Sequence, residues 1–118
     1  QELLAQVREI AGVKFLAAQL EGLDGKGLRE FSDQLRDRLP AGVIVLGSAL
    51  DGKANLLVAL SKDLLGRLSA GELIKPLAAQ VGGKGGGRPE LAQAGGTEPA
   101  GLAAALAAVG GLLEKSLV

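Results

Sequence analysis

Seven of the fifteen residues between Gly82 and Gly96 are glycine, in the sequence GGKGGGRPELAQAGG. Glycine loses more backbone freedom on folding than any other residue. A folded chain therefore keeps such a run where the backbone takes positive φ or where another group approaches closely. A flexible linker is the alternative, since glycine-rich tracts usually form linkers. The Arg88–Leu91 segment, the second Gly-Gly pair and a helical pattern on each side favour an ordered loop.

The composition of this loop predicts an anion-binding site. Successive glycine amides in mixed right- and left-handed conformations form a concavity that binds anions. Lys84 and Arg88 would add positive charge, and Gln93 would reach a hydroxyl or a base edge. For Arg88 a salt bridge to Glu90 is an alternative role, and for Gln93 a hydrogen bond to the loop backbone. The candidate phosphate-binding residues are Gly82, Gly83, Lys84, Gly85, Gly86, Gly87, Arg88 and Gln93.

The apolar pattern predicts a single α/β (α+β) domain, with a mixed sheet of three or four strands packed with helices. Strands are expected at 13–20, 42–50 and 55–60, and Leu91–Ala94 could add a short fourth strand. Asp51-Gly52 is a strong signal for a two-residue hairpin turn. A helix between the first two strands makes them parallel neighbours.

Capping residues place the starts of three helices. Asp24 is a good N-cap, and Ser69 followed by Glu72 predicts a capping box. Thr97 is expected to cap the last helix, with Pro99 just inside its start. Residues 1–10 show one apolar stripe and predict an N-terminal helix that Gly12 ends. We therefore expect residues 1–11 to end a helical, coiled-coil-like arm and residues 12–118 to form one globular domain.

Composition argues against several classes of function. The chain has 118 residues with no histidine, no cysteine and a formal net charge of zero. The commonest general base, metal ligand and thiol nucleophile are therefore missing, and we expect no catalytic residues, no metal and no cofactor. The glycines are not a phosphate-binding P-loop, because Lys84 is followed by Gly85 where that motif has Ser or Thr. No apolar run approaches the length of a membrane span, so we expect no membrane partner.

The stretch GGKGGGRPELAQAGG resembles the glycine-rich signature of the DHH-associated domain at the C-terminus of alanyl-tRNA synthetases. The resemblance extends from about Gly12 to the end and includes LSKD at 60–63 and SAGELIK at 69–75. It implies a non-catalytic, cytoplasmic module that binds the elbow of alanine-specific tRNA and couples aminoacylation with editing. It also implies two further partners, which are the rest of the synthetase chain and a second copy joined through the helical arm.

Two alternatives belong to other classes. The same domain type accompanies DHH-type phosphoesterases and nucleases, where it forms part of the substrate site. Members of that group have a histidine after the glycines, whereas this chain has Arg88. The second alternative is a dimerisation or interaction module with a rigid loop. An RNA-binding domain should instead gather Lys84 and Arg88 on one face with other basic residues, for which the candidates are Lys62, Arg67 and Lys75.

Overall fold

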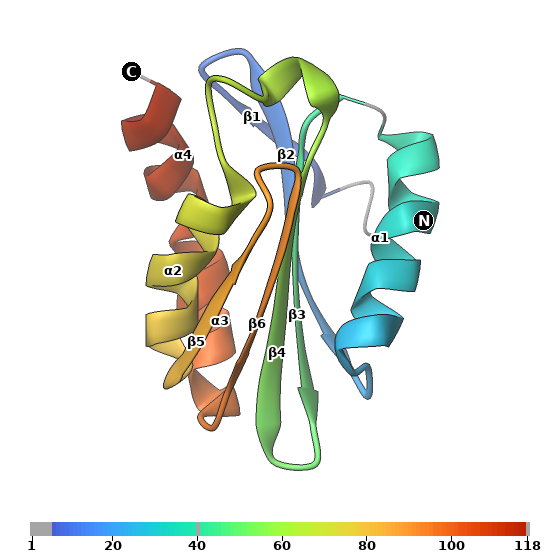
Figure 1. The fold of residues 1–118 in the computed structure, drawn as a ribbon, viewed down its shortest axis with the longest axis vertical. Coiled ribbons are helices and arrows are strands. Elements are labelled where there is room, and N and C mark those ends of the chain that lie inside the picture. The colour runs from blue at the N-terminus through green and yellow to red at the C-terminus, as the bar shows by residue number, and fades with distance from the viewer. Residues whose placement is uncertain (1–5, 40, 118) are drawn as a thin grey trace.

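The computed structural model describes residues 6–39 and 41–117, which form three layers (Figure 1). A mixed sheet lies between helix α1 (Gly25–Arg38) on one side and three helices on the other, namely α2 (Ala70–Gln80), α3 (Leu102–Ala107) and α4 (Val109–Leu117). The strands are β1 (Arg8–Ile10), β2 (Val13–Glu21), β3 (Val43–Leu50), β4 (Lys53–Leu60), β5 (Gly83–Gly87) and β6 (Leu91–Gly96). Short 3-10 helices, η2 (Lys62–Leu64) and η3 (Pro99–Gly101), follow β4 and β6.

The six strands lie in the order β1-β2-β3-β4-β6-β5. β2 and β3 are parallel and are connected through α1, and every other neighbouring pair is antiparallel. This confirms the mixed sheet, the parallel pair and the β3–β4 hairpin. Asp51 and Gly52 both take positive φ, 54° and 75°, as its two-residue turn requires. The predicted number of three or four strands is wrong, because β1 and β5 extend the sheet at its two edges.

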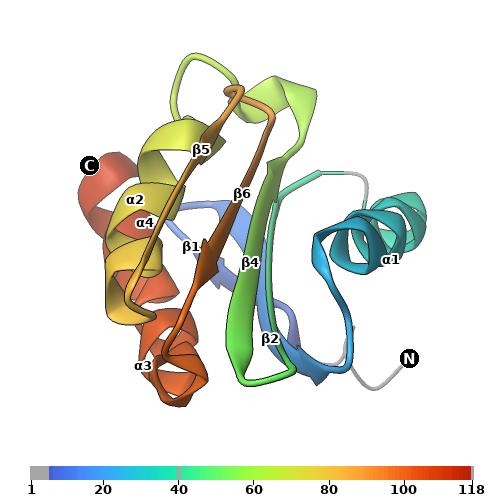
Figure 2. The same ribbon diagram turned by 60° about the horizontal axis from the view of Figure 1, so that its bottom comes forward.

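Each face of the sheet has its own apolar core, because successive strand residues point to opposite sides. On one face Leu16 and Leu57 pack against Leu28 of α1. On the other face a larger cluster joins Phe15 to residues of α2, α3 and α4. Figure 2 shows the two helical layers on either side of the strands. The unbroken apolar run of β3 is therefore buried on both sides, as the sequence predicted.

The predicted N-terminal helix is wrong where the structure describes it. Residues 1–5 lie outside the described residues, and Arg8–Ile10 form strand β1. Ala11 and Gly12 take φ of 51° and 81° and make a two-residue turn that pairs Ile10 with Val13. Gly12 therefore serves a hairpin turn and does not end a helix. Val7 and Ile10, which would share one face of a helix, instead pack against the two cores on opposite faces of the sheet.

The glycine-rich stretch is a β-hairpin and not the loop that the sequence predicted. Gly83–Gly87 form the edge strand β5, which pairs with β6 from Gly83 opposite Gly96 to Gly87 opposite Ala92. The expected short strand at 91–94 is confirmed and extends to Gly96, pairing with β4 on its other side. Glycine has low intrinsic β-propensity, so this strand forms through its tertiary neighbours and not through local preference.

The three predicted caps have different outcomes: Asp24 is confirmed, Ser69 is confirmed in position but not in its capping box, and Thr97 is wrong. The Asp24 carboxylate accepts a hydrogen bond from the Gly27 amide at 2.8 Å, as predicted for an N-cap. Ser69 precedes α2 without any side-chain capping bond, and Glu72 pairs with Lys75 instead of completing a capping box. Glu98, not Thr97, precedes the final helical region, and Pro99 lies in its first turn.

The last helix is broken. Segments 99–107 and 109–117 meet at an angle of 42°, next to the Gly110-Gly111 pair, a sequence that favours kinks. Among the described residues no single helix has both the length and the hydropathy of a membrane span. The two segments 99–107 and 109–117 have that length and hydropathy only when they are counted as one helix. Their apolar residues are buried against the sheet, namely Leu102, Ala105, Val109 and Leu113.

Candidate nucleic-acid interface

Strand β5 approaches its neighbours closely because it consists largely of glycine. A Cβ atom on Gly85 would collide with the side chain of Ala94 and would lie 2.8 Å from the Gln93 carbonyl oxygen. On the α2 side, a Cβ atom on Gly71 would lie 3.0 Å from the Gly87 carbonyl oxygen. The hairpin is thus held tightly between β6 and α2. Because β5 is an extended strand, its amides do not form the concavity that the sequence predicted.

The turn between β5 and β6 is fixed by three backbone hydrogen bonds. The Pro89 carbonyl accepts from the Ala70 amide at 2.8 Å, and the Glu90 carbonyl accepts from the Leu60 amide at 2.9 Å. Arg88 donates its amide to the Leu91 carbonyl at 2.9 Å. The turn therefore presents the Arg88 side chain, which is 80% exposed, from an ordered backbone. The Arg88 guanidinium lies 3.7 Å from the Glu90 carboxylate, so the predicted pairing of these two residues is present.

Lys84 lies on the face of the sheet that α1 covers in part. It is opposite Gly95 in the β5–β6 register, and opposite residues of an antiparallel pair share a face. Its side chain is exposed. Lys84 and Arg88 are four positions apart, roughly 13 Å along a strand. The two cations thus lie near opposite ends of β5.

Gln93 is engaged with α1. Its amide nitrogen donates to the Gly25 carbonyl at 2.7 Å, and its amide oxygen accepts from the Arg29 guanidinium at 2.6 and 3.2 Å. Gln93 therefore has a structural role, but its partners lie on α1. The sequence had suggested the backbone of the glycine-rich loop as the alternative partner. The structure also brings Arg29, which sequence reasoning missed, next to the predicted site.

The other basic candidates do not gather around Lys84. Lys75 pairs with Glu72 at 3.3 Å on the exposed side of α2. Arg67 lines a cavity of about 310 Å³ with Lys14 and Arg38. Asp63 also lines it and accepts a 2.5 Å hydrogen bond from the Ser61 hydroxyl. Lys62 is exposed on η2.

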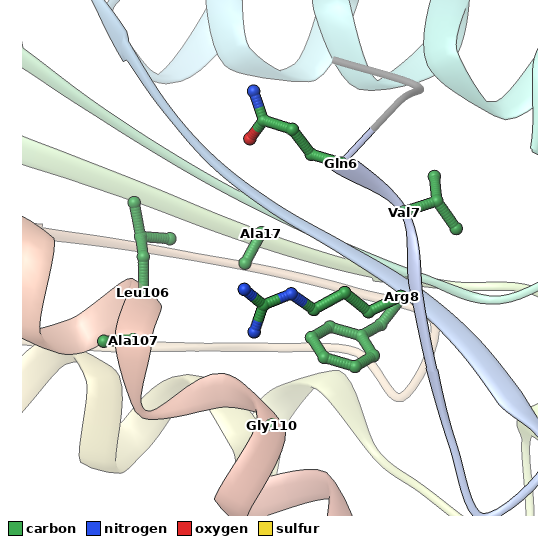
Figure 3. A pocket seen from close by; sticks show the side chains of 8 residues that line it. Gln6, Val7, Arg8, Ala17, Leu106, Ala107 and Gly110 are labelled. Carbon is green, nitrogen blue, oxygen red and sulfur yellow. The ribbon is translucent and has the colours of Figure 1, made fainter.

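A cavity of about 530 Å³ lies at the edge of the sheet opposite the glycine hairpin. β1, β2 and the junction of α3 and α4 line it. The Arg8 side chain extends into it toward Leu106 (Figure 3). It contains none of the residues singled out from the sequence.

Among the described residues no three acidic side chains are close enough together to hold a metal ion. With histidine and cysteine absent from the sequence, the arrangement offers cations, amides and a glycine-rich face. Cationic side chains and backbone amides are groups whose chemistry favours anions.

The fold and the glycine hairpin agree with one known family. Residues 12–115 match the DHHA1 domain, so this chain belongs to the DHHA1 domain family. Its curated relatives include an alanine–tRNA ligase of Thiobacillus denitrificans, 53% identical over 116 residues, and one of Cupriavidus necator, 57% identical over 109 residues. These matches cover 98% and 92% of this chain but 13% and 12% of the two ligases. The chain thus spans about one eighth of the relatives' length.

Solved structures give the same result at the level of the fold. The C-Ala domain from Aquifex aeolicus alanyl-tRNA synthetase superposes with a TM-score of 0.83 at 27% identity, covering 92% of this chain and 97% of that one. A DHH-domain protein described as a member of a family of ribosomal proteins superposes with a TM-score of 0.58 at 16% identity, which shows a shared fold alone. It covers 96% of this chain and 29% of the other.

Proposed function

We propose that this chain is the tRNA-binding C-terminal domain of an alanine–tRNA ligase. The observation that carries the proposal is its similarity over nearly the whole chain to the C-Ala domain, combined with over 50% identity to ligases from two organisms. In this proposal the domain contacts the tRNA elbow and couples aminoacylation with editing, which the rest of the ligase chain performs. The setting is cytoplasmic.

The glycine hairpin supports the proposal through its exposed cations. Lys84 and Arg88 project from an ordered edge strand and its turn, and their spacing of roughly 13 Å suits two different phosphates of one strand. Arg88 is paired only with an exposed carboxylate at 3.7 Å, an interaction that costs little to replace. In this proposal each side chain binds one phosphate, and the domain itself binds tRNA without a catalytic role.

The partners follow from the length of the relatives. Because those ligases are about eight times longer, the remaining ligase chain is the natural second partner of this domain. The homodimer expected through residues 1–11 stays a prediction, and Arg8–Ile10 do not favour it, because they pair with β2 instead of extending a helix.

The test is binding of labelled alanine-specific tRNA to this chain across a salt series. A non-cognate tRNA, a single-stranded oligonucleotide and an acceptor-stem hairpin without the elbow are measured alongside. Lys84→Ala and Arg88→Ala should each weaken tRNA binding and reduce the salt slope by about 0.9, as expected for one phosphate contact. Lys75→Ala is the matched control, because Lys75 lies on α2, which covers the other face of the sheet from Lys84.

Three outcomes distinguish the functions. Stronger binding to whole tRNA than to the acceptor-stem hairpin supports recognition of the elbow. Preference for the single-stranded oligonucleotide would favour the substrate-binding domain of a phosphoesterase. A folded chain that binds none of these RNAs would contradict the proposal and favour an interaction module.

A further inference from the structure

The glycines of the hairpin fall into two groups according to the room available for a side chain. A Cβ atom on Gly83, Gly85 or Gly87 would collide with atoms of β6. A Cβ atom on Gly86 would meet no atom within 4 Å, and one on Gly95 would meet a single backbone oxygen at an ordinary 3.8 Å. Neither of these two residues has positive φ. Packing within this chain therefore explains the first group and leaves Gly86 and Gly95 unexplained.

Gly86 and Gly95 share one face of the sheet. Gly86 is opposite Gln93, and Gly95 is opposite Lys84. Gln93 bonds to α1, so this is the α1 side of β5 and β6. We call these four residues, Lys84, Gly86, Gln93 and Gly95, the glycine shelf. Figure 2 shows α1 set beside the central strands, with β5 on the far side of β6 from it.

Arg29 borders the glycine shelf and is held in one orientation. Its Nε and one terminal nitrogen donate to the Gln93 amide oxygen, and Gln93 is fixed in turn to the Gly25 carbonyl. The ion pairs found among the described residues, Lys75 with Glu72 and Arg88 with Glu90, do not include Arg29 or Lys84. An exposed guanidinium is thus pre-oriented by a neutral partner, and its second terminal nitrogen has no hydrogen-bond or ion-pair partner among the residues that the structure describes.

The spacing of the two cations suits a ligand that crosses the shelf. Lys84 and Gln93 are diagonal neighbours, with about 7–8 Å between them, so Arg29 and Lys84 flank the two open glycines. Beyond Gly95 the shelf opens into a groove of about 500 Å³. The groove is lined in part by Asp51, Lys53 and Asn55.

We propose that the glycine shelf receives the sugar–phosphate backbone of RNA, with Arg29 and Lys84 each binding a phosphate. Gly86 and Gly95 then lack side chains so that the RNA backbone can lie directly on the strands. Arg29 is suited to this role because a planar guanidinium can donate two parallel hydrogen bonds to a phosphate. Gln93 occupies only the edge formed by Nε and one terminal nitrogen, so the edge formed by the two terminal nitrogens remains for the phosphate. The proposal rests on the RNA-binding function above. It adds that RNA binds the α1 side of β5 and β6 and that Arg29 of α1 takes part.

An anionic ligand explains the shelf better than a protein strand does. A strand added to the sheet would pair with the outer edge of β5 and would not need open glycines on its face. Lys84 and Arg29 would also remain without counter-charges. A second copy of this chain bound at the same place is therefore an outcome that the experiment must distinguish.

The test measures tRNA binding by wild type, Arg29→Ala, Gly86→Ala and Gly95→Ala. Arg38→Ala controls for the loss of one charge on the same helix, and Gly111→Ala controls for an added methyl group at an open glycine. Arg29→Ala should weaken binding about tenfold and lower the salt slope by about 0.9. The two shelf glycine variants should fold normally and bind several-fold more weakly, while both controls bind like wild type.

Amide chemical shifts give a second measurement on the wild-type chain. Addition of tRNA should shift the amides of Gly86, Gly95 and Arg29 more than those on exposed faces of α2 and α4. Wild-type binding that the three shelf variants leave unchanged would overturn the proposal and leave the RNA-binding function intact. Wild type that binds no tRNA would overturn both. Shifts at the shelf that depend on protein concentration without RNA would instead assign it to a second copy.

Discussion

The carbonyl oxygen of Pro89 accepts a hydrogen bond from the amide of Ala70, at 2.8 Å. Ala70 is the first residue of α2, and its amide has no partner within the helix. The turn of the glycine hairpin thus supplies a partner for one of the first-turn amides that a helix leaves unpaired. The start of α2 and the turn that presents Arg88 are therefore fixed together.

Removal of the Asp24 side chain should destabilise the domain, whereas removal of the Ser69 side chain should not. Asp24 accepts from the Gly27 amide, and loss of an N-cap bond costs about 1 kcal/mol. Ser69 makes no such bond. We expect Asp24→Ala to lower the free energy of unfolding in urea by about 1 kcal/mol, and Ser69→Ala to change it by less than about 0.5 kcal/mol.

The paired measurement separates tertiary from local capping at α2. Equal losses for the two variants would contradict the absence of a Ser69 capping bond and restore the capping box that the sequence predicted. Asp33→Ala, in the exposed middle of α1, controls for the loss of one carboxylate.

Ser61→Ala should be among the more damaging polar substitutions. The Ser61 hydroxyl accepts from the buried Gly42 amide at 2.8 Å and donates to the Asp63 carboxylate. An alanine would leave the Gly42 amide without a partner, which costs about 1–3 kcal/mol. Urea unfolding should show this loss, while Ser116→Ala, which removes an exposed hydroxyl on α4, should change stability by less than about 0.5 kcal/mol. A Ser61→Ala domain as stable as wild type would show that water replaces the hydroxyl.

The central part of the fold could be predicted from sequence because its signals are local. The apolar run of β3, the Asp51-Gly52 turn and the Asp24 cap each determine their structure within a few residues. The edges could not be predicted in this way. β1 has three residues and depends on Ala11 taking positive φ, and β5 has four glycines that favour no strand without β6 beside them.

The candidate site was predicted in its composition but not in its geometry. Lys84 and Arg88 are exposed on an ordered hairpin, yet the alternation of faces along β5 becomes visible only once its register with β6 is known. Arg29 was missed because it lies 64 positions before Gln93 in the sequence. One signal was present in the sequence, namely a glycine, Gly25, at the first position of α1. In the structure a Cβ atom there would lie 3.2 Å from the Gln93 amide nitrogen. A glycine in a first helical turn can mark such an approach.

The hairpin glycines should differ sharply in their tolerance of alanine. At Gly85 a methyl group would collide with Ala94, and overpacking of this kind typically costs about 1–3 kcal/mol. At Gly111, exposed in α4, nothing lies within 4 Å, and alanine should stabilise the helix by about 0.5–1 kcal/mol. Thermal or urea unfolding of both variants checks the prediction. Stabilisation by Gly85→Ala would mean that β5 is not packed against β6 as described.

Replacement of Glu90 by glutamine should strengthen RNA binding without changing stability. Glu90 lies 3.7 Å from the Arg88 guanidinium, and exposed pairs of this kind contribute about 0–1 kcal/mol. The carboxylate also repels any phosphate that approaches Arg88. Glu90→Gln removes this repulsion and keeps the shape of the side chain, so we expect tRNA to bind about two- to fivefold more tightly at low salt, with the gain fading as salt screens the charges.

Glu72→Gln is the matched control, because it removes the same charge from the other exposed ion pair. It should leave tRNA binding unchanged, since Glu72 and Lys75 lie on α2, which covers the other face of the sheet from the glycine shelf. The Arg88→Ala, Glu90→Gln double variant should bind no more tightly than Arg88→Ala alone if the glutamate acts by competing for the guanidinium. A full gain in the double variant would instead show that Glu90 repels RNA independently of the Arg88 guanidinium.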